Sequence, residues 1–272
     1  MYRYLLLSLS LSTLILTGCQ QSAFKDTGQQ AKPRTNLSEE FKNYWYSGQA
    51  EVSRYQLTQS RYGQANEGEA VMVFVTEAFL PEKQVKHEAN PGLEDTKVLK
   101  LNKIKRFQTG MYDYSMMMSV FSPVHRKQYP HALKVTSSSQ DWCGQSYLQV
   151  NNRDGNYQWD SRSYFQDMVK ETYETDTTWL EDELWTRLKQ DPESLPTGEV
   201  AVIPGTFFKW LRHRKLKPET ANITQKPYSG DRFKGDELMR YRIRYPEIER
   251  TLTIVYESSF PHMIKGWTDR HK

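Results

Sequence analysis

Residues 131–165 read HALKVTSSSQDWCGQSYLQVNNRDGNYQWDSRSYF, and this stretch decides the fold. Its pattern predicts three successive strands, with a bend at residues 142–144 between the first two. The dipeptide Asp154-Gly155 is typical of a type I′ hairpin turn, because both central residues of that turn need positive φ. We therefore expect the core to assemble around an antiparallel hairpin here.

The hairpin turn also determines which residues of its two strands face each other. It places Val150 opposite Trp159 and Leu148 opposite Ser161, and alternation along a strand puts Tyr157 on the same face. We expect this face to turn toward the core, because a shift of one residue would expose the aromatic side chains. The opposite face then carries Tyr147, Gln149, Gln158 and Asp160.

The composition is that of a folded, exported domain. The 272 residues are 13% aromatic and 37% apolar, which is enough for a sizeable core and too much for a disordered chain. The net charge is +4, falls by one when Arg3 is removed with the leader, and is spread over many charges of both signs. This balance excludes a nucleic-acid-binding protein.

The N-terminus has the pattern of a bacterial lipoprotein leader. Arg3 precedes an apolar run at residues 5–16, which is too short to span a bilayer as a permanent helix. The run ends in LTGC at residues 16–19, which resembles the lipobox of such leaders. The resemblance implies cleavage before Cys19 and acylation of its thiol and new amine, and several acyl chains (palmitate among them) anchor a protein stably.

The residues that follow Cys19 predict which membrane holds the protein and how the rest of the chain is organised. Gln20 rather than Asp follows the cysteine, which by resemblance to enteric sorting rules points to the outer membrane. Behind a leader at residues 1–18, the polar residues 19–37 are expected to form a lipidated tether that reaches on the order of 20–25 Å as a flexible coil. Residues 38–272 are expected to form a single antiparallel β domain.

Cys143 is the one cysteine left after the anchor, so the mature chain holds no intramolecular disulfide. A leftover cysteine in an exported protein is a candidate nucleophile or redox thiol. The other interpretation is a small buried residue beside Trp142, because unpaired cysteines are among the most buried residue types. We expect Cys143 to be buried and inert.

The remaining chain is rich in strand signals. About ten strand candidates with short connections imply antiparallel pairing, and residues 63–68 are expected to form the turn between the first two. The consecutive methionines at 116–118 are interpreted as core filling, with a soft ligand pocket as the alternative. Residues 38–46 predict a short helix capped by Ser38.

The clearest helix is expected at residues 177–191. Leu180, Leu184 and Leu188 recur at four-residue spacing, which gives an apolar stripe. The acidic residues 181–183 lie near its positive N-terminus and are interpreted as dipole partners, not as an acid–base pair. We expect this helix to cover one opening or face of the sheet.

A second hairpin is predicted near the C-terminus. With Pro246-Glu247 as its turn, Tyr241 lies opposite Leu252. Its other face is basic and is either a site for an anion or acidic polymer or the polar outer face of a sheet. The residues of that row are Arg240, Arg242 and Arg244.

One further basic stretch is a candidate contact surface. Residues 207–217 combine Trp210 and two phenylalanines with a run of Lys and Arg. The combination favours an anionic membrane surface or a partner protein, and a solvated basic segment is the alternative.

The chain lacks the motifs of catalysis and metal binding. There is no His-Glu-x-x-His, Cys-x-x-Cys, Gly-x-Ser-x-Gly or Walker motif. Six histidines are scattered along the chain, and only His125 and His131 are close enough to meet across a loop. We expect no catalytic residue, no metal and no cofactor.

Several strings together resemble a family of uncharacterised bacterial lipoproteins typical of Bacteroidetes, often labelled septum formation inhibitor Maf. They are YWYSGQAE at 44–51, QSRYG at 59–63, VLKLN at 98–102, HALKV at 131–135 and WCG at 142–144. The Maf label itself denotes cytoplasmic nucleotide pyrophosphatases with a Ser/Arg-rich phosphate motif near the N-terminus, which this chain lacks. The resemblance therefore implies membership of the lipoprotein family and no activity or catalytic residue.

These observations lead to one expectation for the fold. We expect a mainly β protein with minor α content: a strongly curved antiparallel sheet or half-barrel with one or two covering helices, similar to the lipoprotein carriers.

For function we expect a membrane-anchored envelope protein without catalysis, which binds an amphiphilic ligand or an envelope partner. A structural or assembly protein and, less favoured, a hydrolase or thiol enzyme using Cys143 are the alternatives. Besides the lipid-bearing Cys19, the candidate contact residues are Trp142, Cys143, Tyr147, Trp210, Arg240, Arg242 and Arg244.

Overall fold

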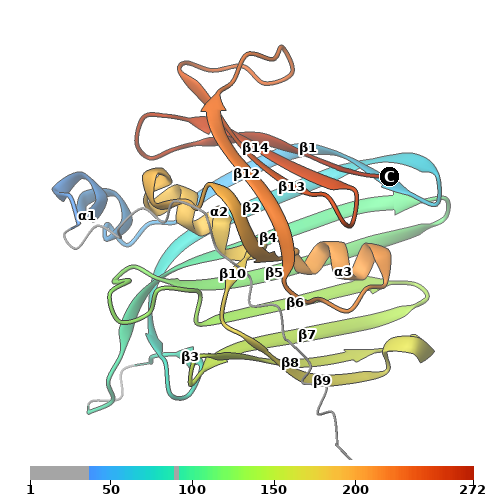
Figure 1. The fold of residues 1–272 in the computed structure, drawn as a ribbon, viewed down its shortest axis with the longest axis horizontal. Helices are drawn as coiled ribbons and strands as arrows, with labels where there is room; N and C mark the ends of the chain where they lie inside the picture. The colour runs from blue at the N-terminus through green and yellow to red at the C-terminus, as the bar shows by residue number, and fades with distance from the viewer. Residues whose placement is uncertain (1–36, 89–91) are drawn as a thin grey trace, which may run out of the picture.

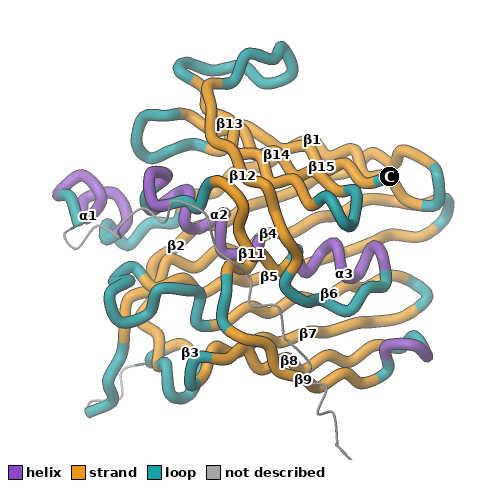
Figure 2. The backbone as a smooth tube through the Cα atoms, in the orientation of Figure 1, coloured by secondary structure: helices purple, strands orange, loops and turns teal. Residues whose placement is uncertain are grey.

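The computed structural model describes residues 37–88 and 92–272. The predicted leader, Cys19 and nearly all of the tether lie outside the described residues. Strands account for 56% of the structure and helices for 13%, and one sheet is strongly curled, so the expected mainly β half-barrel is confirmed. Figures 1 and 2 show two sheets with a helix, α2, between them.

The larger sheet is the curled one, and its neighbours are antiparallel throughout. Its strands lie in the order β1-β2-β4-β5-β6-β7-β8-β9, and the short β3 pairs with β2. The bounds are β1 (Glu51–Arg61), β2 (Gln64–Leu80), β3 (Val85–Lys86), β4 (Thr96–Thr109), β5 (Tyr112–Pro123), β6 (Lys134–Asp141), β7 (Gly144–Arg153), β8 (Asn156–Ser163) and β9 (Lys170–Asp176).

The smaller sheet runs in sequence order from β10 to β15. Its strands are β10 (Trp179–Leu180), β11 (Gly198–Ile203), β12 (Glu219–Pro227), β13 (Leu238–Tyr245), β14 (Arg250–Glu257) and β15 (Ile264–His271). All its pairs are antiparallel except β10 with β11, which is parallel. The sheets meet at one edge, where the Tyr55 hydroxyl of β1 donates to the Ile264 carbonyl at 2.9 Å.

The helices are short and most of them are buried. They are α1 (Glu39–Trp45), α2 (Glu181–Gln190) and α3 (Thr206–Arg212), with single 3₁₀ turns η1 (Gln166–Met168) and η2 (Pro192–Ser194). The predicted first helix is confirmed, because the Ser38 hydroxyl accepts the Phe41 amide at 3.1 Å. Phe41 and Trp45 are its buried residues.

The hairpin of β7 and β8 forms as the sequence predicts. Val150 pairs with Trp159 and Leu148 with Ser161, and Tyr157 and Trp159 are at most 1% exposed. The turn has φ of 52° at Asp154 and 80° at Gly155, as a type I′ turn requires. The register therefore follows from the turn chemistry and from burial of the aromatic face.

Two other expected turns are displaced. The first hairpin turns at Tyr62 and Gly63, both with positive φ, whereas residues 64–68 already belong to β2. The C-terminal hairpin pairs Tyr241 with Ile254 and not with Leu252. Its loop is longer than predicted, because residues 246–249 form it and the Glu249 amide donates to the Pro246 carbonyl. The shift is two residues, so the inner and outer faces stay as predicted.

The expected second helix begins four residues later than predicted. Trp179 and Leu180 pair instead with β11, and the Glu183 carboxylate accepts the Leu180 amide at 3.2 Å. The helix covers one face of the larger sheet, as expected, because it packs against β4 and β5. It lies between the two sheets, and all of its residues except the last are buried.

The three acidic residues at the start of α2 each hold a different part of the fold. The Glu181 carboxylate accepts two hydrogen bonds from the Arg250 guanidinium, at 2.6 and 2.7 Å. Asp182 accepts the amide of Thr206 at the start of α3, at 2.9 Å. Glu183 accepts the Ala132 amide and bonds the His131 ring at 2.8 Å. The buried helix is thus tied to β14, to α3 and to the loop before β6.

A buried lysine, Lys103, packs against aromatic rings of α2 and β15. The Lys103 ammonium lies 3.3 Å from the Trp185 ring centroid on α2 and 4.5 Å from that of Trp267 on β15. Burial, followed by repulsion from Lys105, holds the pKa of Lys103 well below its usual value. The two aromatic faces supply attraction that partly replaces lost hydration.

The central hairpin gives the first test of this structure. Trp159→Ala is expected to lower the free energy of unfolding by about 3–5 kcal/mol, because a large buried aromatic leaves a cavity. Gly155→Val is expected to destabilise through backbone strain alone, since φ is 80° and a Cβ there meets nothing within 4 Å. Denaturant titration of both variants measures the changes. The matched control is Gly155→Asn, which tolerates this backbone conformation; an equal loss in that control would contradict the strain argument.

The pH dependence of stability tests the buried start of α2. Burial, and then the charge of Glu181, raises the pKa of Asp182 from 3.8 to about 6. The folded state therefore disfavours the ionised carboxylate, so the contribution of Asp182 to stability is fully present below pH 3.8, falls as the pH rises through about 6 and is constant above. Asp182→Asn keeps an acceptor for the Thr206 amide and is expected to add about 2 kcal/mol to the free energy of unfolding at neutral pH, and almost nothing near pH 4.

Urea titrations across this pH range measure that gain, with the exposed Asp113→Asn as the matched carboxyl control. A gain that does not depend on pH, or an equal gain in the control, would refute the assignment of the raised pKa to Asp182.

Candidate interaction surface

Four turns of the large sheet come together at one edge, because alternate turns of an antiparallel meander share an edge. They connect β1 to β2, β4 to β5, β6 to β7 and β8 to β9, and they lie on the right in Figure 1. Each turn presents a large apolar side chain that is 62–82% exposed. We call these residues the aromatic rim: Tyr62, Met111, Trp142, Tyr164 and Val169.

Contacts between neighbouring turns hold the rim together. The hydroxyls of Tyr62 and Tyr114 lie 2.9 Å apart, and the Trp142 ring packs near the Tyr112 ring at 6.3 Å. Tyr164 lies against Gly144, where a Cβ would come within 2.8 Å of its ring. The exposed side chains therefore stand on an ordered support.

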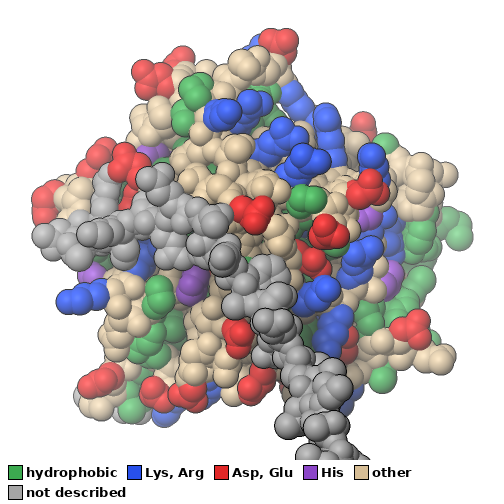
Figure 3. All heavy atoms as spheres, in the orientation of Figure 1, with side chains coloured by type: hydrophobic (Ala, Val, Ile, Leu, Met, Phe, Trp, Pro, Cys, Tyr) green, Lys and Arg blue, Asp and Glu red, His purple; other side chains and the backbone are tan. Residues whose placement is uncertain are grey.

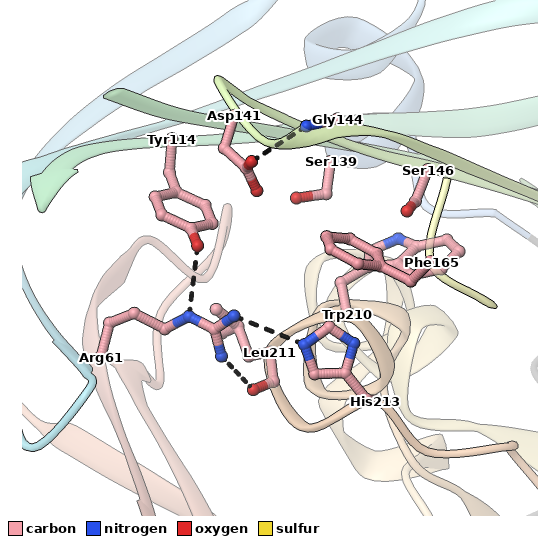
Figure 4. Close-up of a pocket in the computed structure, with 10 residues that line it drawn as sticks. All are labelled: Arg61, Tyr114, Ser139, Asp141, Gly144, Ser146, Phe165, Trp210, Leu211 and His213. Carbon is pink, nitrogen blue, oxygen red and sulfur yellow. Dashed lines mark hydrogen bonds between the residues drawn. The ribbon is translucent and has the colours of Figure 1, made fainter. Parts of the chain in front are cut away.

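Beside the rim lies a narrow pocket, whose lining residues Figure 4 shows. Arg61 extends across it: its guanidinium donates to the Leu211 carbonyl at 2.7 Å and to the Tyr114 hydroxyl at 3.4 Å. The His213 ring lies 3.5 Å from the same guanidinium, and Asp141 accepts the Cys143 and Gly144 amides. The free volume is about 10 Å³, which is room for about one water molecule.

The surroundings shift the pKa of three groups in and beside this pocket. Burial lowers the pKa of His213, and the positive Arg61 beside it acts in the same direction. Burial also raises the pKa of Tyr114, whereas the hydrogen bond from Tyr114 lowers that of Tyr62. At neutral pH the arrangement holds one fixed cation, Arg61, among hydroxyls and rings. Through its hydrogen bonds this cation braces the turns.

A basic segment begins at the last residue of α3 and adjoins the rim. It comprises five exposed residues: Arg212, His213, Arg214, Lys215 and Lys217. The His213 ring packs against Phe165 beside Tyr164, with centroids 5.3 Å apart, and the Lys215 ammonium lies 4.2 Å from the Tyr173 ring of β9. Figure 3 shows Lys and Arg side chains next to the hydrophobic edge of the molecule.

Between the basic segment and the smaller sheet lies a groove of about 360 Å³. Phe208, Leu216 and Ile248 line its apolar part, and Glu219 is its acidic residue. Four members of the basic segment complete its lining. A lining that combines apolar and basic side chains suits an anionic, partly apolar group.

The residues singled out in the sequence fall in separate places. Trp142 belongs to the rim, and Tyr147 is half-exposed on the outer face of β7. Trp210 is buried at the base of the pocket, where its indole donates to the Ser137 hydroxyl at 3.0 Å. The arginine row lies on the outer face of β13, with Arg242 and Arg244 exposed and Arg240 partly so. Cys19 lies outside the described residues.

The expected burial of Cys143 is wrong. The thiol is exposed, because Trp142 and Cys143 occupy the tip of the β6–β7 turn, where neither faces the core. His131, one of the two histidines considered as its partner, bonds Glu183 at the far end of β6, about 25 Å along the strand. His125 also precedes β6 at that end.

Among residues 37–88 and 92–272, no group of three or more His, Cys, Asp and Glu is placed to hold a metal ion. In the same part of the chain no helix has the length and apolar character to cross a bilayer.

Sequence reasoning missed most of this surface. Met111, Tyr164 and His213 belong to three different turns, Arg61 and Tyr62 to a fourth, and no motif links them. Their common signal is position: each lies at or beside the end of a strand or helix. Knowledge of the strand order is needed to see that these ends share one edge.

The exposure of Cys143 gives a direct test. We expect a maleimide to modify Cys143 in the folded protein at a rate close to that in the unfolded chain, because the thiol is exposed at a turn. Cys143→Ser is expected to change the free energy of unfolding by less than about 0.5 kcal/mol. Protection of the thiol until the protein unfolds would contradict the placement of this turn.

Neither a protein-family model, nor a curated protein, nor a solved structure matches this chain.

Proposed function

We propose that this chain is a lipid-anchored protein of the cell envelope, attached to the outer membrane through Cys19, with a non-catalytic accessory role. It acts by contacting other envelope components with its outer surface, not by enclosing a ligand. The leader and lipobox pattern support the anchor, and the surface described above supports the mode of action.

One observation carries this proposal: the concave side of the curled sheet is filled. Met72, Leu101 and Met116 on that side belong to one buried cluster with Leu184 of α2 and Ile254 of the smaller sheet. A carrier that holds acyl chains inside a half-barrel needs that space free. The side chains available for recognition are therefore those on the outside, above all at the rim and the basic segment.

A second candidate function is the binding of an anionic amphiphile. The observation that favours it is the groove beside the basic segment, with Phe208 and Ile248 in its lining together with Lys215 and Lys217. Its volume of about 360 Å³ suits a headgroup or a short chain more than a whole lipid. A thiol enzyme is the weakest candidate, because His131 is engaged by Glu183 far from Cys143.

Replacement of the anchoring cysteine tests the proposal. Cys19→Ser is expected to leave the protein unlipidated and to release it from membranes washed at high salt, since stable anchoring needs the acyl chains. Fractionation followed by intact-mass measurement checks both effects. Cys143→Ser is the matched control and is expected to stay lipidated and membrane-bound.

Retention of the Cys19→Ser protein on salt-washed membranes would contradict the anchor. Mass spectrometry of the natively purified protein separates the two candidates: a stoichiometric bound lipid would favour the amphiphile-binding function, and its absence favours a surface-acting accessory protein.

A further inference from the structure

The aromatic rim is unusual for its concentration of exposed apolar side chains. Eleven large hydrophobic residues are strongly exposed among the described residues, and five of them lie on these four turns. Single exposed apolar residues are ordinary, but a contiguous group marks a contact surface. The contacts of Tyr112 with Trp142 and of Tyr164 with Gly144 show that this group is held in place.

The charges around the rim are mostly positive. Arg61, Lys170, Arg212, Arg214 and Lys215 lie on or beside its turns, and Lys217 of the basic segment pairs with Glu219 at 3.9 Å. The acidic side chains near the rim are Asp113, Asp141 and Asp167, and Asp141 is engaged by the Cys143 and Gly144 amides. A surface that combines Trp and Tyr with an excess of Lys and Arg is complementary to an anionic membrane interface, where amphipathic rings sit at headgroup level.

The position of the rim is compatible with an anchor at Cys19. The N-terminal end of the domain lies far from the rim, because the Trp45 carbonyl accepts from Thr76, twelve residues or about 40 Å along β2 from the rim. The segment from Cys19 to residue 37 spans at most about 60 Å when extended. The length of this segment therefore allows both the anchor and the rim to reach one bilayer.

We propose that the aromatic rim and the basic segment form a second membrane contact, which docks the domain on a bilayer of anionic phospholipids. This inference rests on the proposed function and names the anionic bilayer as one envelope component that the outer surface contacts. Trp142 and Tyr164 enter the headgroup region, and the basic segment binds lipid phosphates. The lipid anchor and the rim are then two separate membrane contacts, which together hold the domain in a defined orientation.

Vesicle binding by the chain from Gln20 onward tests the inference without the anchor. That chain retains every described element, since all of them lie after residue 36. We expect it to bind vesicles of equal parts phosphatidylglycerol and phosphatidylcholine, to bind phosphatidylcholine vesicles weakly, and to lose binding as salt rises. Arg212→Gln with Arg214→Gln is expected to lower the partition coefficient roughly 30-fold, and Trp142→Ser about tenfold.

Matched controls come from the other faces of the molecule. Arg242→Gln with Arg244→Gln removes the same charge from the outer face of β13, and Tyr147→Ser removes an exposed aromatic from the middle of β7. Both are expected to leave vesicle binding within about twofold of the unmodified chain, an effect of a few tenths of a kcal/mol. An equal loss in these controls would overturn the assignment of the contact to the rim.

Fluorescence gives an independent readout of depth. Trp142 is 74% exposed, whereas five of the other six tryptophans are buried and Trp267 is partly so. Lipids brominated near the headgroup are expected to quench wild-type emission, and Trp142→Phe is expected to abolish that quenching.

Absence of binding to the anionic vesicles, or binding without quenching of Trp142, would overturn the inference and leave a protein partner as the occupant of the rim. Neither result would alter the membrane fractionation of the Cys19→Ser variant, so failure here is distinguishable from failure of the proposed function.

Discussion

The fold depends on a helix that is buried on every side and yet begins with three carboxylates. Each carboxylate has its own partner: Arg250 for Glu181, the Thr206 amide for Asp182, and His131 with the Ala132 amide for Glu183. A buried charge without such a partner costs several kcal/mol, so these contacts constrain where the surrounding elements sit. They fix β14, α3 and the start of β6 around one point.

The same helix determines where function can reside. Because α2 and the smaller sheet occupy the concave side of the curled sheet, a large ligand has no room there, and the interior becomes a rigid scaffold. The scaffold's alternate turns are then displayed at one edge, supported from below by Tyr112, Tyr114 and Arg61. A stiff support matters for a contact surface, since side chains that are already ordered lose less entropy when they bind.

Local chemistry explains what the sequence could predict. Asp154-Gly155 set the register of the central hairpin, and Ser38 set the start of α1, because turns and caps depend on adjacent residues. Tertiary pairing explains the errors: Trp179 and Leu180 join β11 instead of extending α2. Cys143 was expected to be buried from the average behaviour of its residue type, but its place at a turn tip exposes it.

The interaction surface could not be predicted from the sequence without the order of the strands in the larger sheet. Tyr62 and Tyr164 are about a hundred residues apart, and they share an edge only because an even number of antiparallel strands, β2 and β4 to β8, separates their turns. The turns in between, residues 124–133 and Asp154-Gly155, lie at the opposite edge for the same reason. There His131 is hydrogen-bonded to Glu183. The two edges therefore differ in role. One binds the buried helix α2 to the sheet, and the other exposes aromatic and basic side chains to the surroundings.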